Sequence, residues 1–336
     1  MVTPQGFTSV AVIGAGAWGT ALAALCARGG VDTTLWAREE EVATAIRETG
    51  ENPAFLPGIK LPQGIGATHD LGMAAACEAI LFVVPAQFAR PMFAELKIIA
   101  AENAPVALCS KGVERETGLL MTEVLAEVWP HARPAVLSGP SFARDVAAGM
   151  PTAVTLACAH AALGERWAAT LGGPTFRPYL SEDLTGAELG GAVKNVLAVA
   201  AGVVDGKGLG ESARAALITR GFAEFRRLGE ALGAQPQTMA GLSGLGDLIL
   251  TASSPQSRNM SLGVELGKGR ALNDILGERI SVSEGAASAA AVIRLARTAG
   301  VETPICDAVA ALIEGARDVD GIIADLLSRP ITSEAK

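Results

Sequence analysis

The sequence predicts an α/β fold, with a doubly wound, parallel sheet in its N-terminal part and an all-helical C-terminal part. Up to about residue 180, short apolar runs alternate with segments of helical periodicity. Each run is nearly continuous in apolar residues, as in strands that helices cover on both faces. Beyond about residue 185 only helical patterns follow. We therefore expect two domains, residues 1–185 and 186–336.

The elements follow from these runs in chain order. Strands are expected at 9–14, 33–37, 79–84, 105–110, 134–139 and 152–157. Helices between them are expected at 17–28, 86–102 and 117–128, and a loop rich in Pro and Gly at 51–70. In the second half, helical spacing covers 186–204, 213–232 and 284–300, the last ending at Gly300 as a helix-terminating glycine.

Composition limits the class of protein. Half of the 336 residues are hydrophobic and 18% are charged, which is typical of a compact globular chain with room for two cores. The net charge of −8 argues against a nucleic-acid partner, although a few local cations can still hold a small anion. The five cysteines are scattered and odd in number, so we expect reduced, buried thiols. Neither a signal peptide nor membrane insertion is expected, and we predict a cytoplasmic protein.

Three glycines mark the first candidate site. In "SVAVIGAGAWGTALAALC", Gly14, Gly16 and Gly19 fit G-x-G-x-x-G between an expected strand and an expected helix. In a Rossmann-type fold the first glycine allows a tight turn, the second lets the backbone approach a pyrophosphate, and the third lets helix and strand pack closely. In this context a dinucleotide site is favoured over an incidental turn.

The end of the second strand bears on cofactor choice. A site selective for NAD places Asp or Glu there, where it accepts from the ribose 2′-hydroxyl. The stretch "TTLWAREE" has Arg38 at that position, and Asp32 lies at the other end of the strand. Because an arginine can bind a 2′-phosphate, NADPH is favoured over NADH. The alternative is that Arg38 is a surface charge beside Glu39 to Glu41.

Lys194 is the candidate proton donor. The three histidines lie in a loop, near a helix end and at the start of an alanine-rich helix, and Tyr179 has no lysine four residues on. Lys194 is the one charge between Leu189 and Val204, and burial would lower its pKa toward neutrality, as acid–base catalysis requires. The adjacent Asn195 indicates a polar cavity rather than a lysine snorkelling to the surface. No metal site is expected.

Two further stretches look suited to anions. Ser257, Arg258 and Asn259 immediately precede an apolar helical run, so that an arginine lies at a helix N-terminus. The second stretch holds Lys111, which lies just past a strand, at the edge where doubly wound sheets bind ligands. Asp247 follows a glycine-rich turn before the first stretch. The alternative for each, taken alone, is an ordinary loop or helix cap.

Taken together, the chain resembles the bacterial NAD(P)-dependent glycerol-3-phosphate dehydrogenases along almost its whole length. The matching stretches run in family order and are "GAGAWGTALA", "LWAR", "NPAFLPGIKLP", "FVVPAQ", "SKGVE", "SGPSFARDVAAGMPTAV", "GAVKNVLAVAAG", "ALITRG", "GLSGLGDLILT", "SRN" and "SEG". The resemblance implies reversible reduction of dihydroxyacetone phosphate to sn-glycerol 3-phosphate, for phospholipid synthesis, with NADPH or NADH. Helical second domains often bury apolar faces in dimers, so a homodimer stays open.

The resemblance also implies roles for residues. It makes Lys194 the general acid–base, with Asp247 orienting it or its neighbours. Cofactor contacts, together with those from the glycine motif, would be Gly14, Gly16, Ala17, Trp18, Gly19, Arg38, Lys111, Ala143, Arg258 and Glu284. Substrate contacts would be Lys111, Gly139, Ser141, Lys194, Asn195, Asp247, Ser257, Arg258 and Asn259.

The chain departs from the family pattern in places. Ala17 stands where Ser is common and Ser212 where Asn is common, and Lys207 and Gly208 replace apolar residues. These changes bear on affinity. Three other interpretations stay open: a related dehydrogenase of the hydroxyisobutyrate or 6-phosphogluconate type, a dinucleotide sensor without turnover, and a purely structural helical partner, which would leave the glycine motif unexplained. The phosphate-binding "SRN" stretch argues against the first, and the presence of Lys194, Asp247 and Arg258 against the second.

Overall fold

The computed structural model describes residues 5–278 and 284–329. Their contacts divide the chain into two compact units. The first contains residues 5–114, Leu119–Gly191 and Gly233–Asp247. The second contains Arg115–Gly118, Ala192–Leu232 and the described residues from Leu248 onward.

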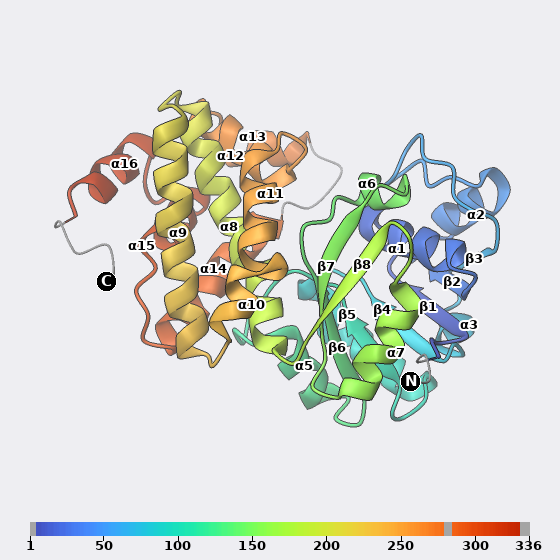
Figure 1. Ribbon diagram of the computed structural model, residues 1–336. Helices are drawn as coiled ribbons and strands as arrows, with labels where there is room; N and C mark the ends of the chain where they lie inside the picture. Colours follow the sequence, from blue (N-terminus) through green and yellow to red (C-terminus); the bar gives the residue numbers. More distant parts are fainter. Residues whose placement is uncertain (1–4, 279–283, 330–336) are drawn as a thin grey trace. The chain divides into compact units, whose positions relative to one another are not determined.

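The first unit is built on one eight-stranded sheet (Figure 1). The strands are β1 (Ser9–Ile13), β2 (Asp32–Trp36), β3 (Ile65–Thr68), β4 (Ala79–Phe82), β5 (Pro105–Leu108), β6 (Arg133–Ser138), β7 (Thr152–Ala157) and β8 (Phe176–Ser181). Their order in the sheet is β3-β2-β1-β4-β5-β6-β7-β8. All neighbours run parallel except β6 and β7.

Helices cover both faces of this sheet. Their bounds are α1 (Ala17–Arg28), α2 (Glu40–Thr49), α3 (Leu71–Ala75), η1 (Ala86–Phe88), α4 (Ala89–Ile99), α5 (Met121–Val128), α6 (Ala143–Ala147) and α7 (Ala161–Leu171). Along β1, Val10 and Val12 belong to one core cluster, which includes residues of α1 and α7. The alternate residues Ala11 and Ile13 belong to the other, with residues of α4 and α5. This two-sided burial confirms the predicted fold class.

Two strands lie outside the predicted set. β3 falls within the stretch expected to be a loop, and β8 was not expected at all. β3 is four residues long and contains Gly66, so it carries almost no apolar signal. β8 is a largely exposed edge strand that contains Pro178, a residue that sequence patterns associate with loops but that edge strands tolerate. The expectation of a parallel sheet was wrong at one place, the antiparallel β6–β7 pair.

The sheet order reverses between β1 and β4. The chain adds β2 and β3 on one side of β1, then crosses to the other side for β4 and β5. In doubly wound sheets, ligands bind at the carboxyl ends of the strands at such a switch point. Gly14 follows β1 there, and Val83 follows β4.

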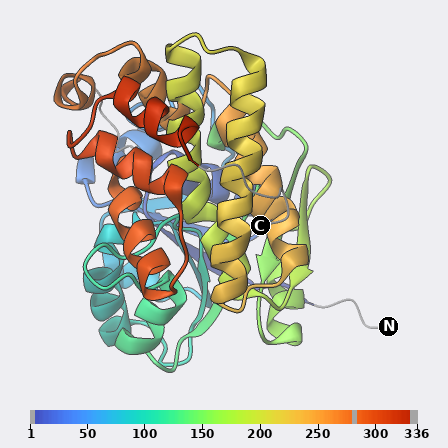
Figure 2. The same ribbon diagram turned by 90° about the vertical axis from the view of Figure 1, so that its left-hand side faces the viewer.

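The remaining helices follow one another after β8, as the sequence predicted. They are α8 (Leu184–Gly206), α9 (Glu211–Ala231), α10 (Pro236–Ala240), a π-helical segment (Leu242–Gly246), α11 (Asp247–Ser253), α12 (Arg258–Gly267), α13 (Leu272–Gly277), α14 (Glu284–Thr298), α15 (Pro304–Ile313) and α16 (Val319–Leu327). In the second unit α15 lies beside α9 and α14 (Figure 2). Gly300 follows α14 with a φ of 68°, as expected for a helix-terminating glycine.

Glycines bring α8 and α12 into backbone contact. A Cβ atom on Gly202 would lie 2.1 Å from the Met260 carbonyl oxygen, and one on Gly263 would lie 2.0 Å from the Val199 carbonyl oxygen. Side chains at these positions would therefore force the helices apart. This close crossing fixes the start of α12 against α8, and both segments carry predicted site residues.

Helix α8 is the one helix in the described residues that is long and apolar enough to cross a membrane. Its most apolar 18-residue window is buried entirely within the protein, so we interpret it as a core helix. The five cysteines are free thiols, and four of them are buried, which confirms the expectation for these residues except at the half-buried Cys77.

Candidate functional site

The glycine turn after β1 has the geometry that its motif predicts. Gly14 has a φ of 116°, which favours glycine, and a Cβ on Gly19 would lie 1.8 Å from the Gly14 carbonyl oxygen. A Cβ on Gly16 would meet nothing within 4 Å. Gly14 and Gly19 are thus required by the protein's own packing. Gly16 is not, so the open space in front of it is available to a ligand.

Neighbouring segments hold this turn in place. The Gly14 N–H donates to the Trp36 carbonyl oxygen at the end of β2, at 3.1 Å. The fully buried Asn52 donates from Nδ2 to the Ala15 carbonyl oxygen and to Thr20 Oγ1, both at 2.8 Å. Asn52 lies in the stretch expected to be a loop, and sequence reasoning did not single it out, although it is the Asn of "NPAFLPG".

The residues around the turn fit a dinucleotide. Gly16 precedes α1, and the first turn of a helix presents N–H groups with no partner inside the helix. Such groups bind phosphate well. Trp18 Nε1 is buried without a hydrogen-bond partner in the described residues, and an orphaned donor of this kind is suited to a ligand's acceptor. Ala17 and Trp18 therefore lie where cofactor contacts were expected.

Arg38 lies on the surface just past β2. Its side chain is 75% exposed, and its Nε and Nη2 atoms donate to Glu39 Oε1 at 2.9 and 2.8 Å. A guanidinium here can reach a ligand in solution. The pairing with Glu39 also agrees with the alternative of a surface charge.

Four predicted site residues meet in the first unit. Lys111 Nζ donates to Asp247 Oδ2 at 2.9 Å and to the Gly139 carbonyl oxygen at 3.3 Å. Ser141 Oγ donates to the same carbonyl oxygen at 3.0 Å. Asp247 is 1% exposed and Lys111 is half-buried. The cluster thus joins an ammonium, a carboxylate, a hydroxyl and a carbonyl.

The backbone beside this cluster is tightly packed. A Cβ on Gly139, which has a φ of 150°, would lie 2.9 Å from the Val154 Cα. Ser138 Oγ, directly before it, is buried with no hydrogen-bond partner in the described residues. Ala143 begins α6 four residues further on. Glycine is therefore required at 139 for packing, whatever it contacts in a ligand.

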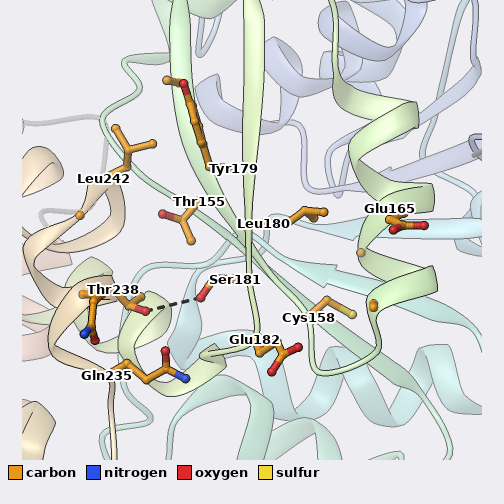
Figure 3. A pocket seen from close by; sticks show the side chains of 15 residues that line it. Thr155, Cys158, Glu165, Tyr179, Leu180, Ser181, Glu182, Gln235, Thr238 and Leu242 are labelled. Atoms are coloured by element: carbon orange, nitrogen blue, oxygen red, sulfur yellow. Dashed lines mark hydrogen bonds between the residues drawn. The ribbon is translucent and has the colours of Figure 1, made fainter. Parts of the chain in front are cut away.

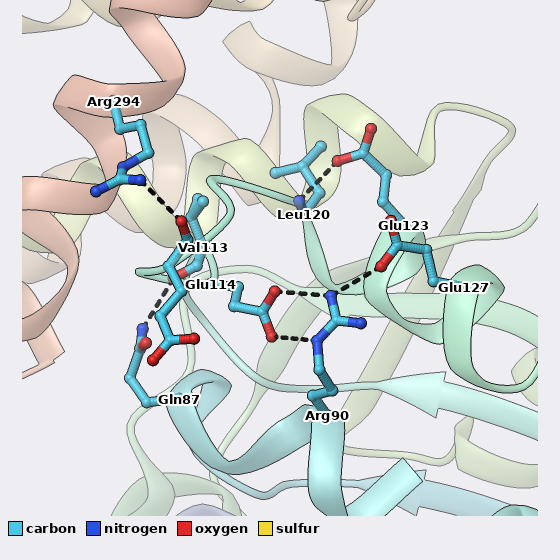
Figure 4. A network of polar contacts seen from close by, with 9 residues as sticks. Gln87, Arg90, Val113, Glu114, Leu120, Glu123, Glu127 and Arg294 are labelled. Carbon is cyan, nitrogen blue, oxygen red and sulfur yellow. Dashed lines mark hydrogen bonds and ion pairs between the residues drawn. The ribbon is translucent and has the colours of Figure 1, made fainter. Parts of the chain in front are cut away.

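Arg90 and Gln87 fasten the loop that follows Lys111 (Figure 4). Arg90 on α4 makes a two-pronged pair with Glu114, with both N–O distances 2.8 Å, and also pairs with Glu127. Gln87 Nε2 donates to the Val113 carbonyl oxygen at 2.8 Å. These bonds fix the backbone within three residues of Lys111.

Lys194 lies on α8 in the second unit. The residue is 7% exposed, and its Nζ donates to Thr251 Oγ1 on α11 at 3.1 Å. The burial predicted from its apolar surroundings is confirmed, and snorkelling to the surface was the wrong alternative. Thr251 was not singled out from the sequence, although "DLILT" places it one helical turn after Asp247.

A second polar group in this unit surrounds the start of α12. Asn259 Nδ2 donates to Asn195 Oδ1 at 2.9 Å, and its Oδ1 accepts from the Gly285 N–H at 2.9 Å. Ser257 caps α12 by accepting from the Met260 N–H at 3.2 Å. Both asparagines and Ser257 are buried.

Arg258 is the exposed member of this group, at the first position of α12. A helix N-terminus with an arginine attracts an anion. The predicted contact Glu284 has a side chain outside the described residues. Ser212 is exposed in the first turn of α9, and Lys207 pairs with Asp320 at 2.6 Å.

Two buried glutamates lie outside the predicted site. Glu188 on α8 accepts from the Thr122 N–H and Oγ1, and Glu224 on α9 accepts from the Ile305 N–H at the start of α15. Burial raises the pKa of each carboxyl to about 7. Each carboxyl, carried by one helix, thus accepts a backbone N–H at the start of another helix.

A cavity of about 830 Å³ opens beside β7, β8, α7 and α10 in the first unit (Figure 3). Ser181 Oγ and Thr238 Oγ1 lie 3.4 Å apart in it. None of the predicted site residues lines it. Among the described residues, no group of three or more His, Cys, Asp or Glu side chains is arranged to hold a metal ion.

The family models and the sequence relatives that match this chain name the same enzyme family. The family model for the NAD-dependent glycerol-3-phosphate dehydrogenase N-terminus matches residues 9–163, and the model for the C-terminus matches residues 183–324. The glycerol-3-phosphate dehydrogenase (NAD(P)+) of Parvibaculum lavamentivorans is 58% identical over 328 residues, covering 98% of both chains. That of Caulobacter vibrioides is 58% identical over 98% of this chain and 99% of its own.

Solved structures agree with the sequence relatives. The crystal structure of glycerol-3-phosphate dehydrogenase from Coxiella burnetii superposes with a TM-score of 0.93 at 36% identity. The match covers 96% of this chain and 99% of that chain. Fold, ordered motifs and full-length similarity therefore agree, and the chain belongs to the NAD(P)-dependent glycerol-3-phosphate dehydrogenase family of oxidoreductases.

Proposed function

We propose that this chain reversibly reduces dihydroxyacetone phosphate to sn-glycerol 3-phosphate with NAD(P)H, as a cytoplasmic supply of glycerophospholipid backbones. Family membership and the names of the relatives support the reaction. In this proposal residues 1–185 bind the dinucleotide and residues 186–336 carry the proton donor. A homodimer is part of the proposal as its oligomeric state.

The glycine turn would hold the dinucleotide. The open approach at Gly16 and the N–H groups of the first turn of α1 would receive the pyrophosphate, and Trp18 Nε1 would donate to the ligand. Arg38 would bind a 2′-phosphate, so we expect NADPH to be preferred. Further contacts would come from Lys111, Ala143, Arg258 and Glu284. When bound, the reduced nicotinamide supplies a hydride to the carbonyl carbon.

Lys194 would complete the reduction by giving a proton to the carbonyl oxygen. The observation that carries this role is a buried lysine, 7% exposed as a residue, whose Nζ donates to Thr251 Oγ1. The hydroxyl holds Nζ in one position, and burial excludes the water that would compete for the proton. In the reverse direction the neutral amine would accept the proton of the substrate hydroxyl.

The other polar groups would bind the phosphate and the hydroxyl groups of the substrate. Arg258 and the N–H groups at the start of α12 would hold the phosphate, with Ser257, Asn259 and Asn195 as neutral partners. Lys111 and Asp247 would bind the polar end of the triose, together with Gly139 and Ser141.

Replacement of Lys194 tests this assignment. A positioned general acid contributes about 10²–10⁴-fold in rate. We expect Lys194→Met to lose at least about 10²-fold in kcat, while calorimetry shows cofactor affinity within about twofold of wild type. Lys97→Met, at an exposed position of α4, is the matched control and should keep full turnover. Turnover near the wild-type rate in Lys194→Met would remove this residue from the mechanism.

A further inference from the structure

The end of β2 carries an arginine and a glutamate that are bonded to each other. We propose that the two side chains recognise the substituent on the cofactor's ribose, with Arg38 binding a 2′-phosphate and Glu39 binding a 2′-hydroxyl. Glu39 is then the residue that lets the site accept NAD(H) as well as NADP(H). This inference rests on the proposed function, because it concerns the cofactor of that reaction.

The position of the pair follows from the sheet. Strand β2 pairs with β1 through Ile13 and Trp36, and the Gly14 N–H donates to the Trp36 carbonyl oxygen. The glycine turn is thereby fixed beside the end of β2. In folds of this kind the adenosine ribose lies next to the residues that follow β2. Arg38 and Glu39 are those residues.

The contact between the two side chains is suited to exchange. Both guanidinium donors, Nε and Nη2, bind one carboxylate oxygen, Oε1, at 2.9 and 2.8 Å. The side chains are 75% and 44% exposed, and exposed pairs of this kind are weak. No other partner of Arg38 is found among the described residues. A ligand phosphate can therefore displace Glu39 from Arg38.

The chemistry of the two groups is complementary. A guanidinium binds a phosphate dianion through two hydrogen bonds, and a carboxylate repels it. A carboxylate accepts from a ribose hydroxyl, whereas a guanidinium has no acceptor to offer. With a 2′-phosphate, Glu39 is a competitor for Arg38. With a 2′-hydroxyl, Glu39 is the binding partner and Arg38 stays paired to it.

Helix capping does not explain the presence of a glutamate at position 39. It precedes α2 as the N-cap residue, yet its side chain makes no capping hydrogen bond. Replacing it with glutamine should therefore leave the fold intact. Glu41, in the first turn of α2, is exposed and offers the same change of charge two residues away.

Calorimetric titration of the wild type, Glu39→Gln and Glu41→Gln with NADP+ and with NAD+ tests the inference without relying on turnover. We expect Glu39→Gln to bind NADP+ about threefold to tenfold more tightly at low salt, because a competing charge is removed. The same variant should bind NAD+ about threefold to tenfold more weakly. Glu41→Gln should change the ratio of the two constants by less than about twofold.

The result that overturns the inference is a Glu39→Gln protein in which the NADP+ to NAD+ ratio matches that of Glu41→Gln. Arg38→Met separates this failure from failure of the proposed function. If Arg38→Met loses NADP+ affinity while Glu39→Gln changes nothing, the cofactor site stands and the role of Glu39 falls. If the wild type binds neither nucleotide, the proposed function itself is contradicted.

Discussion

The three glycines after β1 serve different purposes, although the motif treats them alike. Gly14 and Gly19 are needed because a Cβ at either position would meet backbone atoms, at 3.0 and 1.8 Å. Gly16 faces open space, so the folded chain alone gives no reason for it. Its reason must lie in what approaches it. A pair of substitutions can therefore separate packing from binding.

We expect Gly16→Ala to fold normally and to bind NADP+ at least about tenfold more weakly, because the new methyl group occupies the space for the pyrophosphate. Gly19→Ala should instead be destabilised by about 1–3 kcal/mol or fail to fold, since its Cβ overlaps the Gly14 carbonyl. Thermal unfolding and calorimetric titration of both proteins measure the two effects. Unchanged NADP+ affinity in Gly16→Ala would rule out this placement of the pyrophosphate.

Predictions for single residues succeeded where the pattern that identifies the residue lies within one segment of the sequence. Lys194 and Asn195 were recognisable as polar residues in an apolar helix, and both are buried. Partners from distant segments were not recognisable. Thr251 holds Lys194, and Asn52 holds the glycine turn, across 57 and 37 residues of chain. No local pattern specifies such pairs, because they exist only once the elements have packed.

Among the elements of the first unit, the loop after β5 holds a predicted site residue at the end of a strand. It carries Lys111, and α4 fastens it through the Arg90–Glu114 pair and the Gln87–Val113 hydrogen bond (Figure 4). A side chain that must meet a ligand within a few tenths of an ångström needs such support. The partners of Arg90 found in the described part of the chain, Glu114 and Glu127, are not predicted ligand contacts, so we regard it as a positioning residue.

Arg90→Gln should raise KM for dihydroxyacetone phosphate or the cofactor and lower kcat/KM about tenfold, because the loop that carries Lys111 loses a charged, two-pronged anchor. Arg90→Lys should recover part of this loss. Arg166→Gln, which breaks the exposed pair with Glu78 on the same unit, is the matched control and should leave kinetics unchanged. Equal steady-state constants in Arg90→Gln and Arg166→Gln would show that the loop needs no such anchor.

Element prediction was good where a strand is buried on both faces and poor elsewhere. β1, β4 and β7 appear as continuous apolar runs and were placed within two residues of their ends. β3 and β8 are short or exposed at sheet edges, so their sequences lack that run. The direction of β7 relative to β6 depends on the connection between them and not on either strand's composition. A local pattern therefore carried no information about it.

At the scale of the whole molecule, the buried glutamates couple folding to pH. Glu188 and Glu224 have a pKa of about 7 in the folded chain against about 4.5 when unfolded. The folded state therefore binds these protons more tightly, and stability falls as pH rises between the two values. Each carboxyl accounts for about 3 kcal/mol across that range.

We expect urea unfolding to show a more stable protein at about pH 5.5 than at about pH 8. Glu188→Gln and Glu224→Gln should each flatten this dependence, because glutamine keeps an acceptor oxygen and never ionises. Glu48→Gln, an exposed carboxyl on α2, should leave the slope as it is. Identical pH slopes in all four proteins would contradict the burial-induced rise in these two pKa values.

The proposed function makes the folded chain a nicotinamide-dependent reductase of a small phosphorylated ketone. The most direct test mixes purified protein with dihydroxyacetone phosphate and follows nicotinamide absorbance, once with NADPH and once with NADH. We expect rapid loss of absorbance with both cofactors, faster with NADPH, and formation of sn-glycerol 3-phosphate. Absence of turnover with either cofactor, in protein shown by titration to bind them, would contradict it.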